Sequence, residues 1–151
     1  MIAYRIADDR HPIFDATGAM LHGGRWNSRG VPLIYAAETY AGALLEVLVH
    51  ANLSQPPRNH KVIRIHVPDK VVIENLSITE LPDWYAEDMR ASRAFGDRWI
   101  RENRTAVLRV PSVVTAGRES NLLFNPLHPQ FALVEAGRPE SLDWDERLVR
   151  R

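Results

Sequence analysis

Residues 23–49 have the sequence GGRWNSRGVPLIYAAETYAGALLEVLV, in which three kinds of local pattern follow one another. The glycine-rich beginning has no periodic pattern, and we interpret the whole of residues 11–30 as a long loop. Residues 33–37 form a short apolar run, which predicts a buried strand. From Thr39 onward, apolar residues recur at positions 41, 44, 45, 48 and 49, which is one face of an amphipathic helix.

Similar local patterns extend over the rest of the chain. A helix is predicted over residues 84–103, with Gly96 as a weak point in it. Residues 125–129 predict a turn, and the turn-forming residues at 54–59 predict a loop. Strands are predicted at residues 2–7, 61–67, 71–76, 105–110, 112–115 and 131–135. Because strands outnumber helices and rarely alternate with them, we expect an α+β fold, a mixed central sheet with flanking helices.

The length and composition are those of one globular domain, here residues 1–151. Hydrophobic residues make up 45% of the chain and charged residues 25%, as in ordinary soluble proteins. The first residues lack the pattern of a secretory signal, and no apolar run reaches the roughly 20 residues needed to span a bilayer. The chain has no cysteine, which excludes disulfides and thiolate metal sites and suits a reducing compartment. We therefore expect a cytoplasmic protein that does not enter a membrane.

The formal net charge of the chain is zero. Such a chain has no overall field that would draw it to nucleic acid or to an anionic membrane, so direct binding to either is not expected. A near-zero charge also provides little repulsion between copies, which makes association with a partner or as a homodimer reasonable.

Chemistry-bearing side chains concentrate between Gly23 and Glu46. Arg25 follows two glycines, and a guanidinium beside such accessible backbone suits the recognition of phosphate or carboxylate. Tyr35 supplies an aromatic face with a polar tip on the predicted strand. Glu46 lies at the border of the apolar helix face, and Gly42, one turn earlier, is expected to leave open space beside the carboxylate. Each of these residues alone is more often structural, and only their combination indicates an active site.

Two further features leave alternatives open. Glu46 and His50 are one helical turn apart, as two metal ligands can be, but no third ligand follows from the sequence and no metal is expected. Residues 142–148 are acidic and aromatic. They fit a strand or short helix that caps the domain better than a surface for association with another protein.

Six segments, taken together and in this order, resemble the RES domain. The resemblance extends from residue 4 to about residue 148, nearly the whole chain. The segments are Tyr4-Arg5-Ile6, Gly23-Gly24-Arg25-Trp26-Asn27 with Gly30, Ile34-Tyr35-Ala36-Ala37, Ala43-Leu44-Leu45-Glu46, Val110-Pro111-Ser112 and Asn121-Leu122-Leu123-Phe124-Asn125-Pro126. The arginine, glutamate and serine for which the family is named correspond to Arg25, Glu46 and Ser112. The consecutive residues Arg118, Glu119 and Ser120 spell the family's name only by coincidence, and they are given no catalytic role.

The resemblance implies a toxin of a bacterial type II toxin–antitoxin system, with a fold similar to that of ADP-ribosyltransferases. RES proteins consume NAD, and Xre-like antitoxins with a helix-turn-helix segment bind and block them. Some members release nicotinamide from NAD with water or inorganic phosphate, whereas others transfer ADP-ribose to a protein. The sequence leaves these alternatives open. It has no G-x-G-x-x-G between a strand and a helix, so NAD is expected as a substrate and no cofactor is expected.

The resemblance also implies roles for individual residues. Cleavage of the nicotinamide–ribose bond passes through an oxocarbenium-like centre, and Glu46 is expected to stabilise it or to activate the acceptor. The remaining candidates are Arg25 and Arg5 for the pyrophosphate, Tyr35 for stacking on nicotinamide or adenine, Ser112 for the ribose or for holding Glu46, and Trp26 and Asn121 for binding the substrate. A non-enzymatic binding module is the less expected alternative, because such a relative would have lost at least one of the catalytic candidates Arg25, Tyr35, Glu46 and Ser112.

Overall fold

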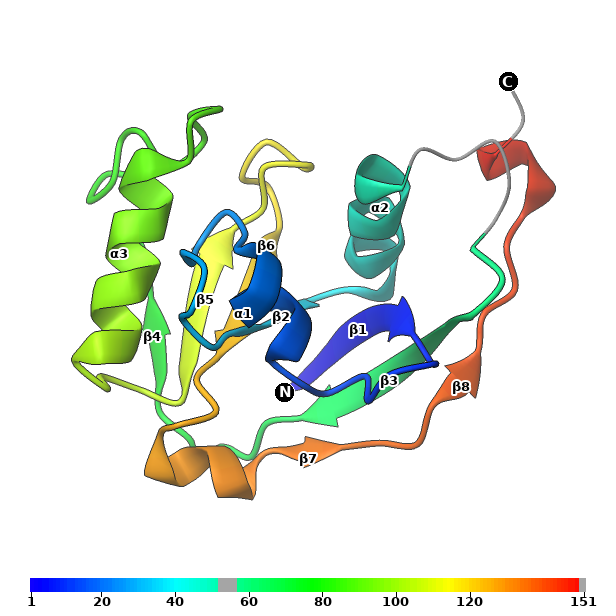
Figure 1. Cartoon of the computed structure of the whole chain (residues 1–151), viewed down its shortest axis with the longest axis horizontal. Helices are drawn as coiled ribbons and strands as arrows, with labels where there is room; N and C mark the ends of the chain where they lie inside the picture. Colours follow the sequence, from blue (N-terminus) through cyan, green and yellow to red (C-terminus); the bar gives the residue numbers. More distant parts are fainter. Residues whose placement is uncertain (52–56, 150–151) are drawn as a thin grey trace.

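Figure 1 shows the computed structural model of the chain, which describes residues 1–51 and 57–149. The strands in this part of the chain are β1 (Ile2–Asp8), β2 (Ile34–Ala37), β3 (His60–His66), β4 (Ile73–Asn75), β5 (Val107–Pro111), β6 (Ser120–Phe124), β7 (Glu135–Ala136) and β8 (Glu140–Ser141). The helices are α1 (Thr17–His22), α2 (Tyr40–His50) and α3 (Arg90–Arg101), with 3-10 helices η1 (Pro129–Leu133) and η2 (Glu146–Leu148). Of the loop predicted at 54–59, residues 54–56 lie outside the described residues.

These strands form one curled sheet in the order β4-β5-β6-β2-β1-β3-β7, and β8 also pairs with β3. The strands β4 and β5 are parallel, whereas the other pairs between described strands are antiparallel. The predicted α+β fold with a mixed sheet is therefore confirmed. No helix among residues 1–51 and 57–149 is long and apolar enough to cross a membrane.

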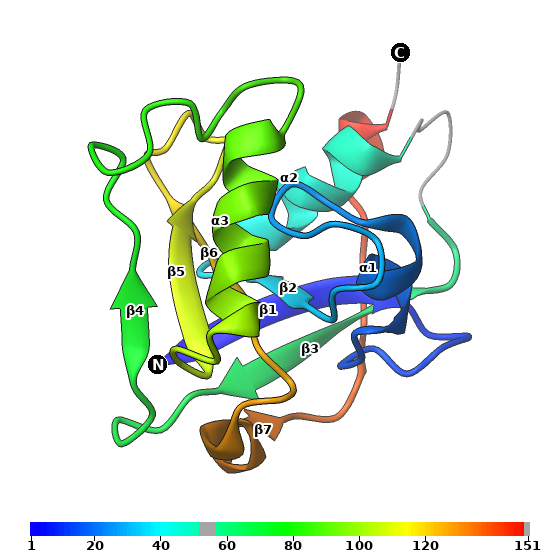
Figure 2. The ribbon, with the colours of Figure 1, turned by 60° about the vertical axis from the view of Figure 1, so that its left-hand side comes forward.

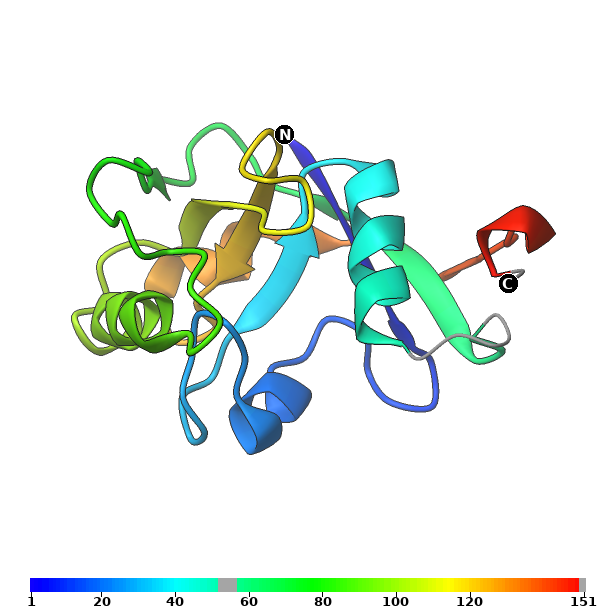
Figure 3. The same ribbon diagram turned by 90° about the horizontal axis from the view of Figure 1, so that it is seen from above.

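The register of the strands places a row of residues on one face of the sheet. Arg64, Tyr4, Ala37, Asn121 and Val110 are successive partners across β3, β1, β2, β6 and β5. Partners in neighbouring strands point to the same face, and the next residue along each strand points to the opposite face. We call the face of this row the helical face, because α2 and α3 both lie over it (Figure 3).

A separate hydrophobic core lies on each face of the sheet. Helix α3 lies along β5 in Figure 2 and covers the core of the helical face, which contains Trp26, Leu33, Leu76, Trp84, Trp99, Ile100, Leu108, Val110 and Leu123. The core of the opposite face contains Ala3, Ile13, Ile34, Ala36, Ile63, Ile65, Val67, Val71, Ala106, Val107, Leu122, Phe124 and Val134. The central strands β2, β5 and β6 contribute to both cores, which explains their nearly continuous apolar sequences.

Helix α2 begins where the sequence predicts, but it is rotated differently about its axis. Thr39 caps it, because its Oγ1 accepts a hydrogen bond from the Gly42 N–H at 2.9 Å. The predicted apolar face is not the buried one, since the side chains of Leu45 and Val49 are 40% and 63% exposed. A Cβ at Gly42 would lie 3.5 Å from the Cβ of Ala37, so the helix approaches the sheet through its small residues. The open space predicted beside Gly42 is therefore absent.

The loop and strand predictions also need corrections. The long loop predicted over residues 11–30 contains α1. Residues 112–115 form a turn rather than a strand, and β6 forms where no strand was predicted. The turn predicted at 125–129 is confirmed, and the His128 side chain at its end caps η1, which replaces the strand predicted at 131–135. Of the strand or short helix expected within residues 142–148, the structure contains the short 3-10 helix η2.

The helix predicted over residues 84–103 forms only as α3, from Arg90 to Arg101. The preceding segment is a series of turns, and Met89, directly before the helix, has a φ of 57°. A Cβ at Gly96 would lie 1.8 Å from the carbonyl oxygen of Trp26. Gly96 is thus a point of close contact between α3 and the glycine-rich loop, and the prediction of a weak point is wrong.

Candidate active site

Glu46 lies at the centre of a hydrogen-bonded group that joins three segments of the chain. Its Oε1 accepts hydrogen bonds from Ser112 Oγ at 3.2 Å and from Asn121 Nδ2 at 2.8 Å. Ser112 directly follows β5 and is almost completely buried, and Asn121 lies in β6 on the helical face. Of the two functions suggested for Ser112, contact with the ribose or support of Glu46, the structure contains the second.

The other carboxylate oxygen of Glu46 faces a different environment. Oε2 accepts no hydrogen bond from the described residues, and His50 Nδ1 lies 3.9 Å away from it. The side chain of Glu46 remains 27% exposed. The carboxylate is thus fixed through one oxygen and available to a ligand through the other.

The glycine-rich loop, residues 23–31, is held by Tyr35 on β2. Tyr35 Oη donates a hydrogen bond to Asn27 Oδ1 at 2.6 Å and accepts one from the Trp26 N–H at 3.0 Å. Burial raises the pKa of Tyr35, so the hydroxyl stays protonated and keeps its donor function. A Cβ at Gly24 would lie 2.6 Å from Tyr35 Oη, which explains why glycine occupies this position.

Arg25 extends from this loop to the segment that precedes α3. Its Nη1 donates hydrogen bonds to the carbonyl oxygens of Trp84 at 3.3 Å and Ala86 at 3.0 Å. The Trp84 ring in turn packs against Gly117, in the turn that begins with Ser112. The other guanidinium nitrogens of Arg25 donate no hydrogen bond to a described residue, so they can bind an anionic ligand.

Two predicted substrate-binding residues lie elsewhere. Arg5 follows Tyr4 in β1 and therefore points to the face opposite Asn121. There its Nε donates to the carbonyl oxygen of Ile13 at 2.6 Å and its Nη1 to that of Tyr35 at 2.7 Å. Arg5 thus ties β1 to β2 and to the loop after β1, and its burial lowers its pKa.

Trp26 is only 2% exposed, and its ring packs edge-on against Phe95 of α3, with ring centroids 6.4 Å apart. It is a core residue in this structure and has no surface to offer a substrate. The glycine before Arg25 and the tryptophan after it therefore fix the loop, while the Arg25 side chain hydrogen-bonds to the segment that precedes α3.

The comparison with known sequences decides the family. The sequence matches the RES domain over residues 2–145. The chain belongs to the RES domain family. It is 39% identical to the "Prs ADP-ribosylating toxin" of Sphingobium sp. (strain YBL2), over 98% of this chain and 96% of that protein. It is 36% identical to "Toxin Res" of Pseudomonas putida, over 86% of this chain and 88% of that protein. This RES-domain protein is thus a toxin of the family.

A solved structure shares the fold of this RES-domain protein. In the crystal structure of the M. tuberculosis MbcT–MbcA toxin–antitoxin complex, the matching chain superimposes with a TM-score of 0.76. The similarity covers 93% of this chain and 83% of that chain, at 20% sequence identity. At that identity the likeness concerns the fold alone.

Sequence reasoning missed two residues that position the site of this RES-domain protein. Asn27 is fully buried, and its Nδ2 donates to the carbonyl oxygens of Ala19 at 2.8 Å and Val31 at 3.0 Å. Glu119 accepts a hydrogen bond from Thr39 Oγ1 at 3.3 Å, so it supports the beginning of α2. An asparagine beside two glycines was the available signal for the first, whereas nothing in the sequence pairs residues 39 and 119.

Among residues 1–51 and 57–149, no group of three acidic, histidine or cysteine side chains is placed to hold a metal ion. The described residues instead offer the Oε2 of Glu46 and the guanidinium nitrogens of Arg25 that make no hydrogen bond within this part of the chain. A carboxylate fixed by neutral donors keeps its negative charge directed at one place, which suits the stabilisation of a developing positive charge.

Proposed function

We propose that this RES-domain toxin consumes NAD by cleaving the bond between nicotinamide and ribose. The observation that carries the proposal is the state of Glu46, whose Oε1 is held by Ser112 and Asn121 while Oε2 is available. The ribose becomes oxocarbenium-like as the bond breaks, and a fixed carboxylate lowers the energy of that state. The sequence similarity to a relative named an ADP-ribosylating toxin supports the same bond as the target.

In the proposed reaction, the electron pair of the broken C–N bond goes to the nicotinamide nitrogen. Nicotinamide, which carries a positive charge while attached, leaves as a neutral molecule and needs no proton. An acceptor such as water attacks the ribose carbon from the opposite side. Glu46 takes up the proton that the water loses and later gives it to solvent.

Arg25 is proposed to bind the pyrophosphate of NAD. Its Nη1 is committed to the carbonyl oxygens of Trp84 and Ala86, and this anchoring fixes the orientation of the remaining guanidinium donors. Tyr35 acts on the reaction as a positioning residue, because its hydroxyl holds the loop that carries Arg25. NAD is a substrate in this proposal, and no cofactor is required.

A protein acceptor is the second candidate. The relative with 39% identity is named the "Prs ADP-ribosylating toxin", which favours transfer of ADP-ribose to a protein over transfer to water or phosphate. The chemistry at Glu46 is the same in both cases, and only the molecule that approaches the ribose differs. The NAD-cleaving proposal covers both acceptors.

An antitoxin is proposed as the partner of this toxin in the cytoplasm. The chain shares its fold with a chain of a solved toxin–antitoxin complex. We propose an Xre-like antitoxin with a helix-turn-helix segment, and a homodimer of the toxin itself, which the zero net charge favours. Co-purification with the product of a neighbouring reading frame tests the antitoxin, and light scattering that gives a monomer mass would contradict the homodimer.

Release of nicotinamide from NAD tests the proposed function directly. Purified protein is incubated with NAD in buffer, in buffer with inorganic phosphate, and in cell lysate with labelled NAD. Free nicotinamide is expected in at least one condition, and its co-product identifies the acceptor. ADP-ribose indicates water, phosphorylated ADP-ribose indicates phosphate, and a labelled protein indicates a protein acceptor. Intact NAD in all three conditions would refute the proposal.

A further inference from the structure

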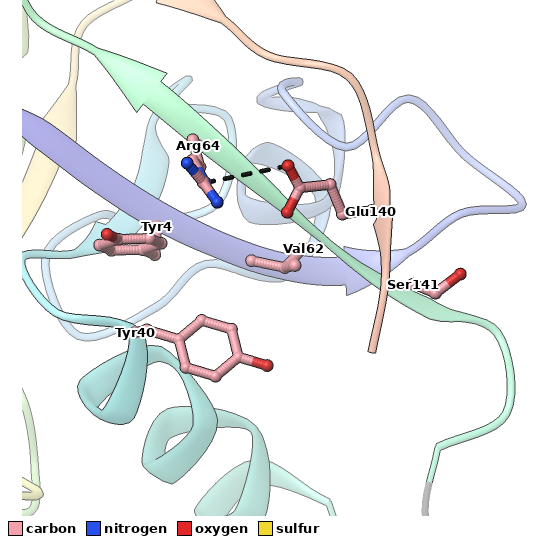
Figure 4. A pocket seen from close by; sticks show the side chains of 6 residues that line it. All are labelled: Tyr4, Tyr40, Val62, Arg64, Glu140 and Ser141. Carbon is pink, nitrogen blue, oxygen red and sulfur yellow. Dashed lines mark ion pairs between the residues drawn. The ribbon is translucent and has the colours of Figure 1, made fainter. Parts of the chain in front are cut away.

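A pocket of about 330 Å³ lies on the helical face at the beginning of α2 (Figure 4). It is lined by Tyr4, Tyr40, Val62, Arg64, Glu140 and Ser141. The volume is at the lower end of the range for small-molecule sites. The lining residues come from β1, α2, β3 and β8, so they are far apart in the sequence and meet only in the folded chain.

Helix α2 separates this pocket from the candidate active site. Tyr4, Ala37 and Asn121 follow one another in the row across β1, β2 and β6. The helix lies over Ala37, the middle residue of the three, through the close approach of Gly42. Glu46 contacts Asn121 on one side of the helix. On the other side Tyr40 packs against Tyr4, with ring centroids 6.0 Å apart, so the pocket is a second site.

The rings and the buried valine give the pocket its shape. The two tyrosine rings are nearly perpendicular, at 78°. In Figure 4 the Tyr40 ring is seen face-on, and Val62 lies between the tyrosines and Ser141. Val62 lines the pocket but is almost completely buried, so the partly exposed ring of Tyr40 is the main apolar surface. A flat, partly apolar group can pack against this ring.

The polar groups of the pocket are not hydrogen-bonded to one another. Arg64 Nε lies 3.8 Å from Glu140 Oε1, which is too long for a hydrogen bond. Arg64 therefore offers donors, and Glu140 offers an acceptor, at neighbouring positions of the rim. The hydroxyl groups of Tyr4 and Tyr40 likewise make no hydrogen bond with the described residues and add further polar contacts.

We propose that this pocket binds a neutral, planar heteroaromatic ring that carries an N–H donor beside an oxygen or nitrogen acceptor. The donor would bind Glu140, the acceptor would bind Arg64, and the ring would pack on Tyr40. The opposite charges of Arg64 and Glu140 leave the rim without a net charge. The carboxylate repels an anion and the guanidinium repels a cation, so a charged ligand is disfavoured. The adenine ring of NAD and free nicotinamide, which is neutral once it is released from NAD, both carry this pattern of groups.

The binding of each ring can be measured without any cleavage of NAD. Adenosine and nicotinamide are titrated separately into ¹⁵N-labelled protein, and the shifts of the backbone amide signals are followed. The proposal expects saturable shifts at residues 4, 64, 140 and 141 with at least one of the two compounds. The comparison of the two compounds identifies the ring, and ribose, which lacks a ring of this kind, is expected to shift none of these signals.

Variants of the pocket give the second part of the test. Arg64→Ala and Glu140→Gln are each expected to weaken the binding about tenfold, since each removes one charge-assisted hydrogen bond. Arg98→Ala is the matched control, because Arg98 is a similarly exposed arginine on α3 with its own partner, Glu102. It is expected to bind the ring as the native chain does. The amide spectrum of each variant also shows whether it is folded.

The absence of shifts at the pocket residues with either compound at millimolar concentration would overturn the inference. Shifts confined to residues 46, 112 and 121 would also overturn it, since they would place the ring in the candidate active site. Equal affinity of folded Arg64→Ala, Glu140→Gln and native protein would contradict the proposed contacts. None of these results depends on whether the toxin cleaves NAD.

Discussion

The glycine-rich loop at residues 23–31 is more buried, and helix α2 more exposed, than their compositions would predict. The loop contains few large apolar residues, yet Trp26 and Asn27 are buried in it. The helix contains many apolar residues, yet Leu45 and Val49 are exposed. Hydrogen bonds from Asn27 and Tyr35 account for the buried residues of the loop. The close approach of Gly42 to Ala37 accounts for the exposed side of the helix. Paired polar atoms and small residues, rather than apolar content, determine which segment is fixed.

The largest expected effect concerns the contact of the loop with α3. Gly96→Ala places a methyl group 1.8 Å from the carbonyl oxygen of Trp26, so the backbone has to move. We expect the free energy of unfolding to fall by about 3 kcal/mol. Urea denaturation measures it. Gly18→Ala is the matched control in α1, because no atom lies within 4 Å of the added methyl group, and it is expected to stabilise the protein slightly. Equal stability of Gly96→Ala and the native chain would contradict the tight contact.

Asn27→Ala tests the hydrogen bonds inside the loop. In a buried region, the substitution leaves the carbonyl oxygen of Val31 without a partner and removes one of the two hydrogen bonds of the Ala19 carbonyl oxygen. It also removes the acceptor of the Tyr35 hydroxyl, which then keeps only the bond from the Trp26 N–H. We expect a loss of about 2 to 3 kcal/mol in the free energy of unfolding, again by urea denaturation. Asn75→Ala, at an exposed position of β4, is the control and should change it by less than about 0.5 kcal/mol. Similar values for the two variants would show that the loop does not depend on Asn27.

Tyr35→Phe is expected to cost about 1 to 1.5 kcal/mol at neutral pH, since it removes one buried hydroxyl and its hydrogen bonds. The folded-state pKa of Tyr35 is raised above its ordinary value near 10.0. The protonated hydroxyl therefore stabilises the fold fully below pH 10, and this contribution is lost as the pH rises through the folded-state pKa. Urea denaturation of both proteins at pH 7 and above pH 10 should show the difference between them shrinking. A difference that grows with pH would refute this assignment.

The smallest effect is expected on the exposed side of α2. Leu45→Ala should lower the free energy of unfolding by less than about 0.5 kcal/mol, because the side chain is 40% exposed. Leu122→Ala, in the buried core of β6, is the contrasting variant and should cost about 2 to 5 kcal/mol. A loss at Leu45 as large as that at Leu122 would mean that the apolar face of α2 is buried after all.

Much of the fold could be predicted from the sequence, because β3 and α2 carry clear periodic patterns and β2 is a short apolar run. The strand β6 could not, because Leu122, Leu123 and Phe124 are all buried between two cores and show no alternation. The rotation of α2 could not either, since the distance between Gly42 and Ala37 depends on the whole sheet. A sequence pattern identifies an apolar face, but the nearest approach to the sheet decides which side is covered.

The candidate active site, too, could be predicted only in part. The sequence indicates which side chains can carry the chemistry, and the structure brings Glu46, Ser112 and Asn121 together from three segments. The structure does not bring Arg5 and Trp26 to Glu46, because alternation along β1 turns Arg5 to the opposite face and Trp26 packs against Phe95 in the core. Contacts between distant segments, such as Thr39 with Glu119, leave no local pattern that a sequence shows.

The most direct test of the account is the rate of nicotinamide release by Glu46→Gln. Glutamine preserves the size of the side chain and removes the negative charge, so kcat is expected to fall about 10³-fold while the urea midpoint changes little. Glu102→Gln, at an exposed glutamate directly after α3, is the control and should retain the native kcat. Native kcat in folded Glu46→Gln would contradict the central claim that this carboxylate drives the cleavage of NAD.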